Sequence, residues 1–261
     1  MARASLSSRL APAAAFQFCF IASVAMLKPG ANALTLSRFK PDALPWLYVG
    51  AAVIAGGLAM IGGDGRRRSN PAVLVGIGAL ASFGLAAGVW LQLPLTALGA
   101  YLFAEAFATQ VSISFWGKVG EAFDAREARR AFSWINGIGM SGAIAGGFLA
   151  QVLARTAGAL ALLIGGGVFL AGAVFAWRAH KVDPEISAGN KPVPITERAG
   201  WQEVARARYT QLLGAVVLGL AALQQLTDYV FRERAAAQLV EADMADLFAA
   251  HQLWTGVFCV V

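Results

Sequence analysis

Long apolar runs alternate with short polar segments along the whole chain. A helix that crosses a bilayer needs roughly 20 mostly apolar residues. The runs that meet this length are Leu10–Leu27, Trp46–Gly63, Ala72–Leu93, Pro94–Trp116, Phe132–Leu153, Ala157–Arg178 and Thr210–Phe231. A further run begins at Leu247 and reaches Val261, the last residue. The pattern predicts an all-α membrane protein made of transmembrane helices.

The spacing of these runs divides the chain into three parts. Residues 1–178 would form a six-helix N-terminal bundle, and residues 179–208 a central cytoplasmic loop. Residues 209–261 would supply the first one or two spans of a second bundle. This is the layout of transporters built from two six-helix halves. Because the last run ends while still apolar, we expect a missing C-terminal half and no transport by these 261 residues alone.

Composition and charge favour a membrane orientation over a soluble protein. The chain is 58% hydrophobic and 14% charged, whereas a soluble domain has about 25% charged residues. If the N-terminus is cytoplasmic, 15 of the 21 basic residues lie on that side, as the positive-inside rule requires. The other side receives Lys28, Arg38, Lys40, Arg155, Arg232 and Arg234. We expect a multi-pass protein of a bacterial inner membrane that binds lipid and no nucleic acid.

The first run has a second interpretation. Arg3 and Arg9, the apolar stretch after them and the small residues near Ala31 also fit a secretory signal peptide. The length of Leu10–Leu27 favours a retained first span, because a signal peptide has a shorter apolar region.

Residues for covalent or metal chemistry are sparse. Cys19 and Cys259 lie in apolar runs near opposite ends of the chain, and His180 and His251 are isolated. None of them has the spacing of a zinc site or a catalytic triad. We therefore expect no metal, no cofactor and no enzymatic activity.

Glu105 is the first candidate for a functional site, because a carboxylate inside a membrane span is costly and usually faces a cavity. Thr109 follows four residues later, which places both side chains on one helical face. We expect this face to line a substrate pathway. The structural alternative is a protonated glutamate that is hydrogen-bonded to a neighbouring helix.

Asp228 and Lys28 are the other pathway candidates. Asp228 lies near the end of the seventh run, where several polar residues interrupt the apolar sequence. Such an interruption marks either a binding site or the polar end of a helix. Lys28, followed by Pro29 and Gly30, ends the first run and either snorkels to the headgroups or points into a central cavity.

The loop between the second and third runs is a candidate conformational latch. It combines glycines with Asp64, Arg66 and Arg67, loosely resembling the corresponding loop of major-facilitator transporters, whose charges hold helix ends during alternating access. Glu127 and Arg130 are its expected counterparts before the fifth run. The alternative is a positive-inside anchor, which explains the arginines but not the aspartate and glycines.

Several segments resemble the ATP/ADP translocases, the nucleotide-exchange carriers of plastids and intracellular bacteria. They are Ala104–Glu105, Ser114–Gly117, Arg126–Phe132, Gly137–Gly139 and Gln225–Arg232. The family reads roughly Ala-Glu-Leu-Trp, Phe-Trp-Gly and Asp-Glu-Ala-Lys-Lys-Phe-Tyr at the first three. The specific matches cover about a third of the chain.

The resemblance implies a major-facilitator-like antiporter, with Glu105 and Asp228 at positions of acidic residues important for transport. Its cargo would be an anionic solute such as a nucleotide. The sequence departs from the family at Lys28–Asn32, where the family has a charged Arg-Asp-Thr-Lys-Asp run and only the first base is kept. The leading function is a secondary transporter working by alternating access. The alternative is a transport-inactive membrane anchor or sensor module of a larger regulatory protein.

Overall fold

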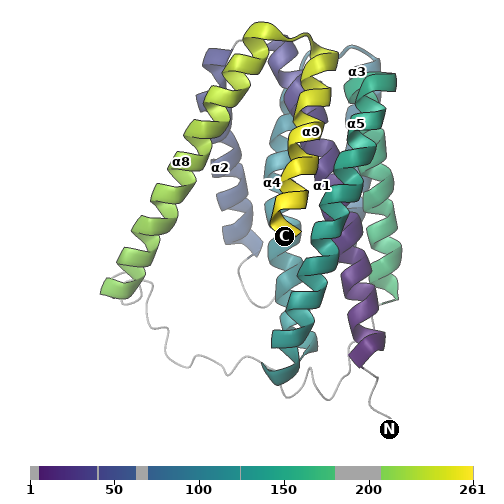
Figure 1. Cartoon of the computed structure of the whole chain (residues 1–261), viewed down its shortest axis with the longest axis vertical. Helices are drawn as coiled ribbons and strands as arrows, with labels where there is room; N and C mark the ends of the chain where they lie inside the picture. Colours follow the sequence, from purple (N-terminus) through teal and green to yellow (C-terminus); the bar gives the residue numbers. More distant parts are fainter. Residues whose placement is uncertain (1–5, 40, 63–69, 124, 180–206, 261) are drawn as a thin grey trace.

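The computed structural model describes residues 6–39, 41–62, 70–123, 125–179 and 207–260, and these are helical almost throughout (Figure 1). The helices are α1 (Leu6–Arg38), α2 (Leu44–Gly62), α3 (Pro71–Trp90), α4 (Thr96–Ala122), α5 (Ala125–Arg178), α8 (Arg208–Gln238) and α9 (Glu241–Val260), with a short 3-10 helix η1 (Pro41–Ala43) before α2. These ranges contain no β-strand. The predicted all-α class is confirmed.

Helix α5 consists of two arms that meet at Gly158. Gly158 has a φ of 67° and a ψ of −162°, a backbone conformation available to glycine and not to a helical residue. Residues 17–22 of α1 face residues 139–146 of the first arm in the same order, and residues 19–27 face residues 166–172 of the second arm in reverse order. The chain therefore turns back at Gly158, and the two arms correspond to the fifth and sixth apolar runs.

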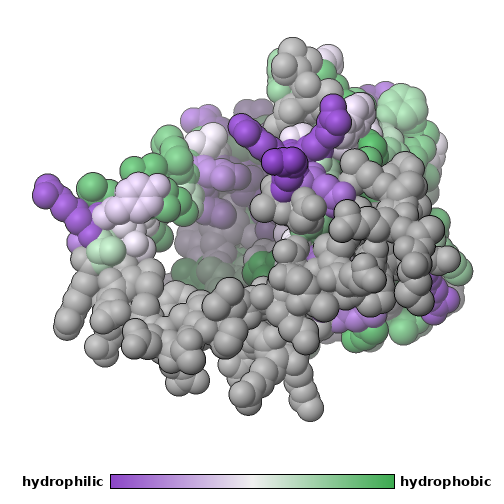
Figure 2. Space-filling view, turned by 90° about the horizontal axis from the view of Figure 1, so that it is seen from below, coloured by the Kyte–Doolittle hydropathy of each residue, from purple (hydrophilic) through white to green (hydrophobic). Residues whose placement is uncertain are grey.

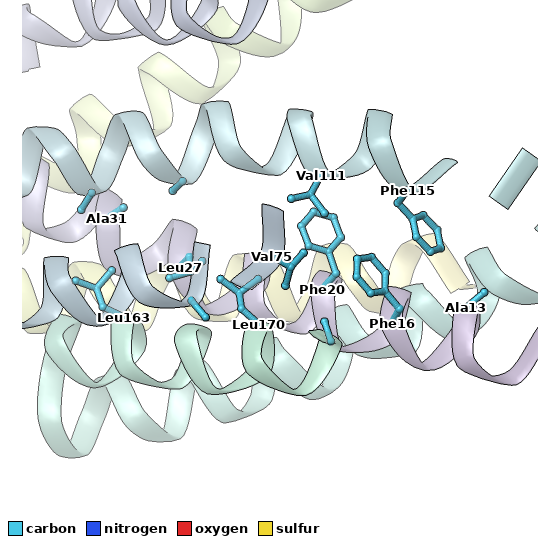
Figure 3. Packing of buried hydrophobic residues seen from close by; sticks show 14 of the residues in the cluster. Ala13, Phe16, Phe20, Leu27, Ala31, Val75, Val111, Phe115, Leu163 and Leu170 are labelled. Carbon is cyan, nitrogen blue, oxygen red and sulfur yellow. The ribbon is translucent and has the colours of Figure 1, made fainter. Parts of the chain in front are cut away.

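Helix α1 lies at the centre of the packed bundle. It contacts both arms of α5, and it also packs against α4 and α9. Figure 3 shows Phe16 and Phe20 pointing from α1 toward Phe115 and Val111 of α4. The Phe16 and Phe115 rings stack with their centroids 4.9 Å apart, and all four side chains are buried. The apolar residues of the first run thus form the core of the bundle.

Helix α1 extends eleven residues beyond the predicted end at Leu27, to Arg38. Pro29 removes one backbone donor from the helix, but the next turn is held in place by packing. A Cβ on Gly30 would lie 2.9 Å from Leu162 Cβ in α5, so the two helices are in close contact there. Thr35 Oγ1 adds hydrogen bonds to the carbonyls of Ala31 and Ala97. Lys28 consequently lies inside a helix and not at its end.

The last two helices also begin or end outside the predicted limits. Helix α8 continues seven residues past Phe231, and α9 starts at Glu241, six residues before Leu247. Helix α9 packs against α5 and α1, so residues predicted for a second bundle lie on the first one. The predicted central loop falls mainly within 180–206, outside the described residues.

Within the part of the chain that the structure describes, four helical segments have the length and composition to cross a membrane: Leu10–Arg38, Pro71–Trp90, Arg126–Arg178 and Arg208–Gln238. Helix α2 contributes a shorter apolar stretch, Leu44–Leu58. Large apolar side chains are exposed along α3, α5 and especially α8, as expected for surfaces that face lipid. The structure is compatible with an integral membrane protein.

Candidate functional site

A cavity of about 990 Å³ lies between α1, α2, α4, α8 and α9. Figure 2 looks into the molecule from the lower end of Figure 1 and shows a hollow with hydrophilic residues in its depth. The volume is at the upper end of the range of small-molecule sites, which is roughly 300–1,000 Å³. The cavity is therefore large enough for a small organic solute.

The first ion pair of the cavity joins α1 to α4. Lys28 Nζ donates to Glu105 Oε2 at 2.9 Å. Because α1 continues through Pro29, the lysine is held beside α4 and pairs with the carboxylate there. Lys28 lines the cavity, and its ammonium pairs with Glu105 there.

The second ion pair lies on α8 and is tied to α1 and α2. Arg232 Nη2 is 2.7 Å from Asp228 Oδ2, four residues earlier on the same helix. Arg232 Nη1 donates to Asn32 Oδ1 of α1 at 2.9 Å. Tyr48 of α2 donates its hydroxyl proton to Asp228 Oδ2 at 3.1 Å. These contacts attach α8 to the rest of the bundle through polar groups.

The two pairs form one chain of alternating charge. Glu105 Oε1 lies 4.0 Å from Arg232 Nη2, so the glutamate is close to both bases. The order is Lys28, Glu105, Arg232, Asp228, with no excess of either sign. In a low-dielectric environment, an ionised group is tolerated when it has such a partner.

The four charged side chains differ in their access to the cavity. The exposed fractions are 28% for Lys28 and 25% for Glu105, 31% for Asp228 and 7% for Arg232. A solute in the cavity can reach one base and two carboxylates directly. The guanidinium is held in the protein, where it compensates the carboxylates.

Two tyrosine rings surround the guanidinium of Arg232. Its Cζ lies 5.5 Å from the ring centroid of Tyr48 and 5.7 Å from that of Tyr101. Tyr101 is buried, and an arginine over an aromatic face is attracted by the ring quadrupole. These rings fix the arginine at the border between the cavity and the core.

The rest of the lining is rich in uncharged polar groups. Thr109 lies one turn beyond Glu105 and donates to the Glu105 carbonyl at 3.3 Å. From α8 and α9 the cavity receives Gln224, Gln225, Thr227, His251, Gln252 and Thr255. Such groups offer both hydrogen-bond donors and acceptors to a bound molecule.

All four predicted pathway residues, Lys28, Glu105, Thr109 and Asp228, line this single cavity. Arg232 was not among the predicted pathway residues, although it also lines the cavity. The predicted seventh run ends at Phe231 and leaves Arg232 outside the span, whereas α8 continues to Gln238 and buries the arginine. The spacing of Asp228 and Arg232, which places opposite charges one helical turn apart, was the available signal.

The predicted latch is only partly within the described residues. Asp64, Arg66 and Arg67 lie outside them. Glu127 and Arg130 lie in the first two turns of α5, where the acid is favourably placed near a helix N-terminus. The latch stays a prediction.

Comparisons with protein-family models, with curated proteins and with solved structures give no match to this chain. Within the described ranges, no group of three or more His, Cys, Asp or Glu side chains is placed to hold a metal ion. The site is therefore characterised by its own geometry, which is a polar, charge-paired cavity among apolar helices.

Proposed function

We propose that this protein is a secondary membrane transporter that works by alternating access, with the charged cavity as its solute-binding site. One observation carries the proposal: residues from α1, α4 and α8 place two ion pairs in one cavity of about 990 Å³. In the proposed membrane setting, ionisable residues mark pathways for solutes or ions. The pairs are costly to bury and would add little to a passive bundle.

Helix α8 is the element best placed to move. Few of its residues contact the bundle, and along it only Arg232 and Ala235 are buried. Its main polar contacts run from Asp228 and Arg232 to Tyr48, Asn32 and Glu105. A solute that competes for these side chains would bias α8 between two positions, as alternating access requires.

The resemblance to ATP/ADP translocases supports exchange of solutes and makes a nucleotide one candidate cargo. The cavity contains Glu105 and Asp228, the two positions to which that resemblance assigns acids important for transport. We propose both that the chain is a member of the ATP/ADP translocase family and that it works as an antiporter. The positive-inside distribution further supports a cytoplasmic N-terminus in a bacterial inner membrane. Efficient labelling of Ser69→Cys in intact cells by a membrane-impermeant reagent would contradict this orientation.

The test is solute flux through the protein as the cell makes it, reconstituted in vesicles. Glu105→Gln keeps the size of the side chain and removes its charge, which leaves Lys28 without its counterion. We expect the variant to insert normally and to lose most of the flux of the transported solute. Thermal unfolding in detergent, measured at matched protein levels, separates lost transport from lost folding.

Two results would overturn the proposal. One is a wild-type flux no greater than that of empty vesicles for every solute of a panel of anions, cations, zwitterions and sugars. The other is undiminished flux in Glu105→Gln. Either result would leave the anchor or sensor function as the better account of the bundle.

A further inference from the structure

We infer that the cavity selects a zwitterionic solute, one that carries a positive and a negative group, over a polyanion. This inference rests on the proposed transport function only for movement of the solute, because binding can be measured separately. Lys28, Glu105 and Asp228 are each about a quarter to a third exposed, whereas Arg232 is buried.

A polyanion such as a nucleoside triphosphate fits this charge arrangement poorly. Its phosphates would meet one accessible ammonium, that of Lys28, and two accessible carboxylates. To bind both bases, the phosphates would have to displace Glu105 and Asp228 from their partners. The released carboxylates would then be unpaired beside added negative charge, which is the costliest arrangement for a partly buried site.

A simple cation is disfavoured because it would leave a basic group of the protein without its counterion. If it took Glu105, it would leave the ammonium of Lys28 without a counterion. If it took Asp228, it would compete with Arg232, which is also held by Asn32 and by the two tyrosine rings. The cation would thus exchange one ion pair for another and leave a protein charge uncompensated.

A zwitterion satisfies every charge of the chain. The anionic group of the solute accepts a hydrogen bond from Lys28 Nζ. Its cationic group donates either to Glu105, the carboxylate close to both Lys28 and Arg232, or to Asp228. The number of positive and negative charges in the site stays equal, so no carboxylate or base is left unpaired. The amides of Gln224 and Gln252 and the ring of His251 line the same cavity and can bind the remaining polar atoms.

The test compares matched probes on the purified chain in detergent micelles. Phenylalanine, phenylpropionate and phenethylamine share a skeleton and differ in charge; glycine betaine supplies a second zwitterion and ATP a polyanion. Equilibrium binding of the labelled probes should give the highest affinity to a zwitterion, by about tenfold over the other classes. Tighter binding of ATP, phenylpropionate or phenethylamine, or no binding of either zwitterion, would overturn the inference.

Charge variants provide the second arm. Glu105→Gln leaves one excess positive charge and should shift the preference toward phenylpropionate by about tenfold, whereas Arg232→Gln should shift it toward phenethylamine. Arg155→Gln is the control, because Arg155 pairs with Asp246 outside the cavity. If Arg232→Gln does not fold, Glu105→Gln decides alone. An unchanged order of affinities in Glu105→Gln contradicts the inference.

The outcomes also separate this inference from the proposed function. Zwitterion binding without flux would count against transport and leave the charge argument intact. Flux of ATP without binding of a zwitterion would support the proposed transport function and overturn the inference that the cavity selects a zwitterion.

Discussion

Helices α1 and α8 are both long and apolar, but they are held in place by different forces. More than half of the apolar stretch of α1 is buried, whereas none of the corresponding stretch of α8 is. Helix α1 is surrounded by α4, α5 and α9. Helix α8 stands apart from the packed bundle along much of its length (Figure 1), and Arg232 is the large buried side chain that joins it to α1.

The difference in burial suggests different roles for α1 and α8. Close packing around α1 gives a rigid frame, since each buried side chain has many dispersion contacts. In the proposed transport cycle, the few polar contacts of α8 would be exchanged for contacts to a solute while that frame stays in place. The contribution of each set of contacts can be tested one residue at a time.

The largest contrast should come from truncating one apolar side chain in each helix. Phe16 is fully buried and stacks on Phe115, so Phe16→Ala should destabilise the protein by about 3 kcal/mol. Leu218 on α8 is 72% exposed, and Leu218→Ala should leave the stability nearly unchanged. Thermal unfolding of both variants in detergent measures the contrast. Similar losses would mean that α8 is packed as tightly as α1.

The next prediction concerns the arginine that attaches α8. Arg232→Met should cost about 3 kcal/mol, because it leaves Asp228 without its base and removes the bond to Asn32. The double variant Arg232→Met/Asp228→Leu should recover much of this loss, since it removes both charges of the pair. A double-mutant cycle on unfolding midpoints gives the coupling. Strict additivity would show that the pair does not hold α8.

A smaller effect is expected at the contact between α1 and the first arm of α5. A Cβ on Gly146 would lie 2.5 Å from the oxygen and 2.7 Å from the Cα of Ala22. Because backbone would have to move, Gly146→Ala should destabilise by about 2 kcal/mol. Gly137 on the same arm has open space around it, and Gly137→Ala should stabilise by up to about 1 kcal/mol. A thermal shift assay should show a lower unfolding temperature for Gly146→Ala and a higher one for Gly137→Ala. Changes of the same sign in both variants would contradict the close contact at Gly146.

The smallest effect should follow the loss of the ion pair between Arg155 and Asp246. These side chains link α5 to α9 at 3.0 Å, and Arg155 is 62% exposed. Exposed pairs contribute roughly 0.2–1 kcal/mol, so Arg155→Gln should lower the unfolding midpoint only slightly, and less in high salt. A loss as large as that of Arg232→Met would remove the distinction between surface and cavity charges.

Hydropathy predicted most of the helices, because apolar length is a property of each segment alone. It ended the first helix at Leu27 and the seventh at Phe231, since polar residues or proline follow in the sequence. Both helices continue because tertiary contacts hold them, at Gly30 against Leu162 in one case and at Arg232 against Asn32 in the other.

The site, like the helices, could be predicted from the sequence only where the signal is local. Glu105 and Asp228 could be singled out because a carboxylate within an apolar run is costly wherever the run folds. The spacing of Asp228 and Arg232 on one helix was a local signal, but the partners from other helices could not be identified from the sequence. Lys28 is 77 residues from Glu105 in the chain, and Tyr48 is 180 residues from Asp228, so their pairing depends on how the helices pack. Tyr48 lies in an apolar run, and nothing in the sequence around it indicates that its hydroxyl donates a hydrogen bond to Asp228.

The central position of α1 has a consequence for biosynthesis. The ribosome completes α1 before α4 and α8, and 200 residues separate Asn32 from its partner Arg232. At about 5–20 residues per second, this delay lasts roughly 10–40 seconds. The asparagine lacks its partner throughout that time, whereas the lysine, which lies 77 residues before Glu105, lacks its partner for about 4–15 seconds. A nascent α1 with these two polar groups would need shelter at the insertion machinery until α4 and α8 emerge, and replacing both by leucine should release it into lipid earlier.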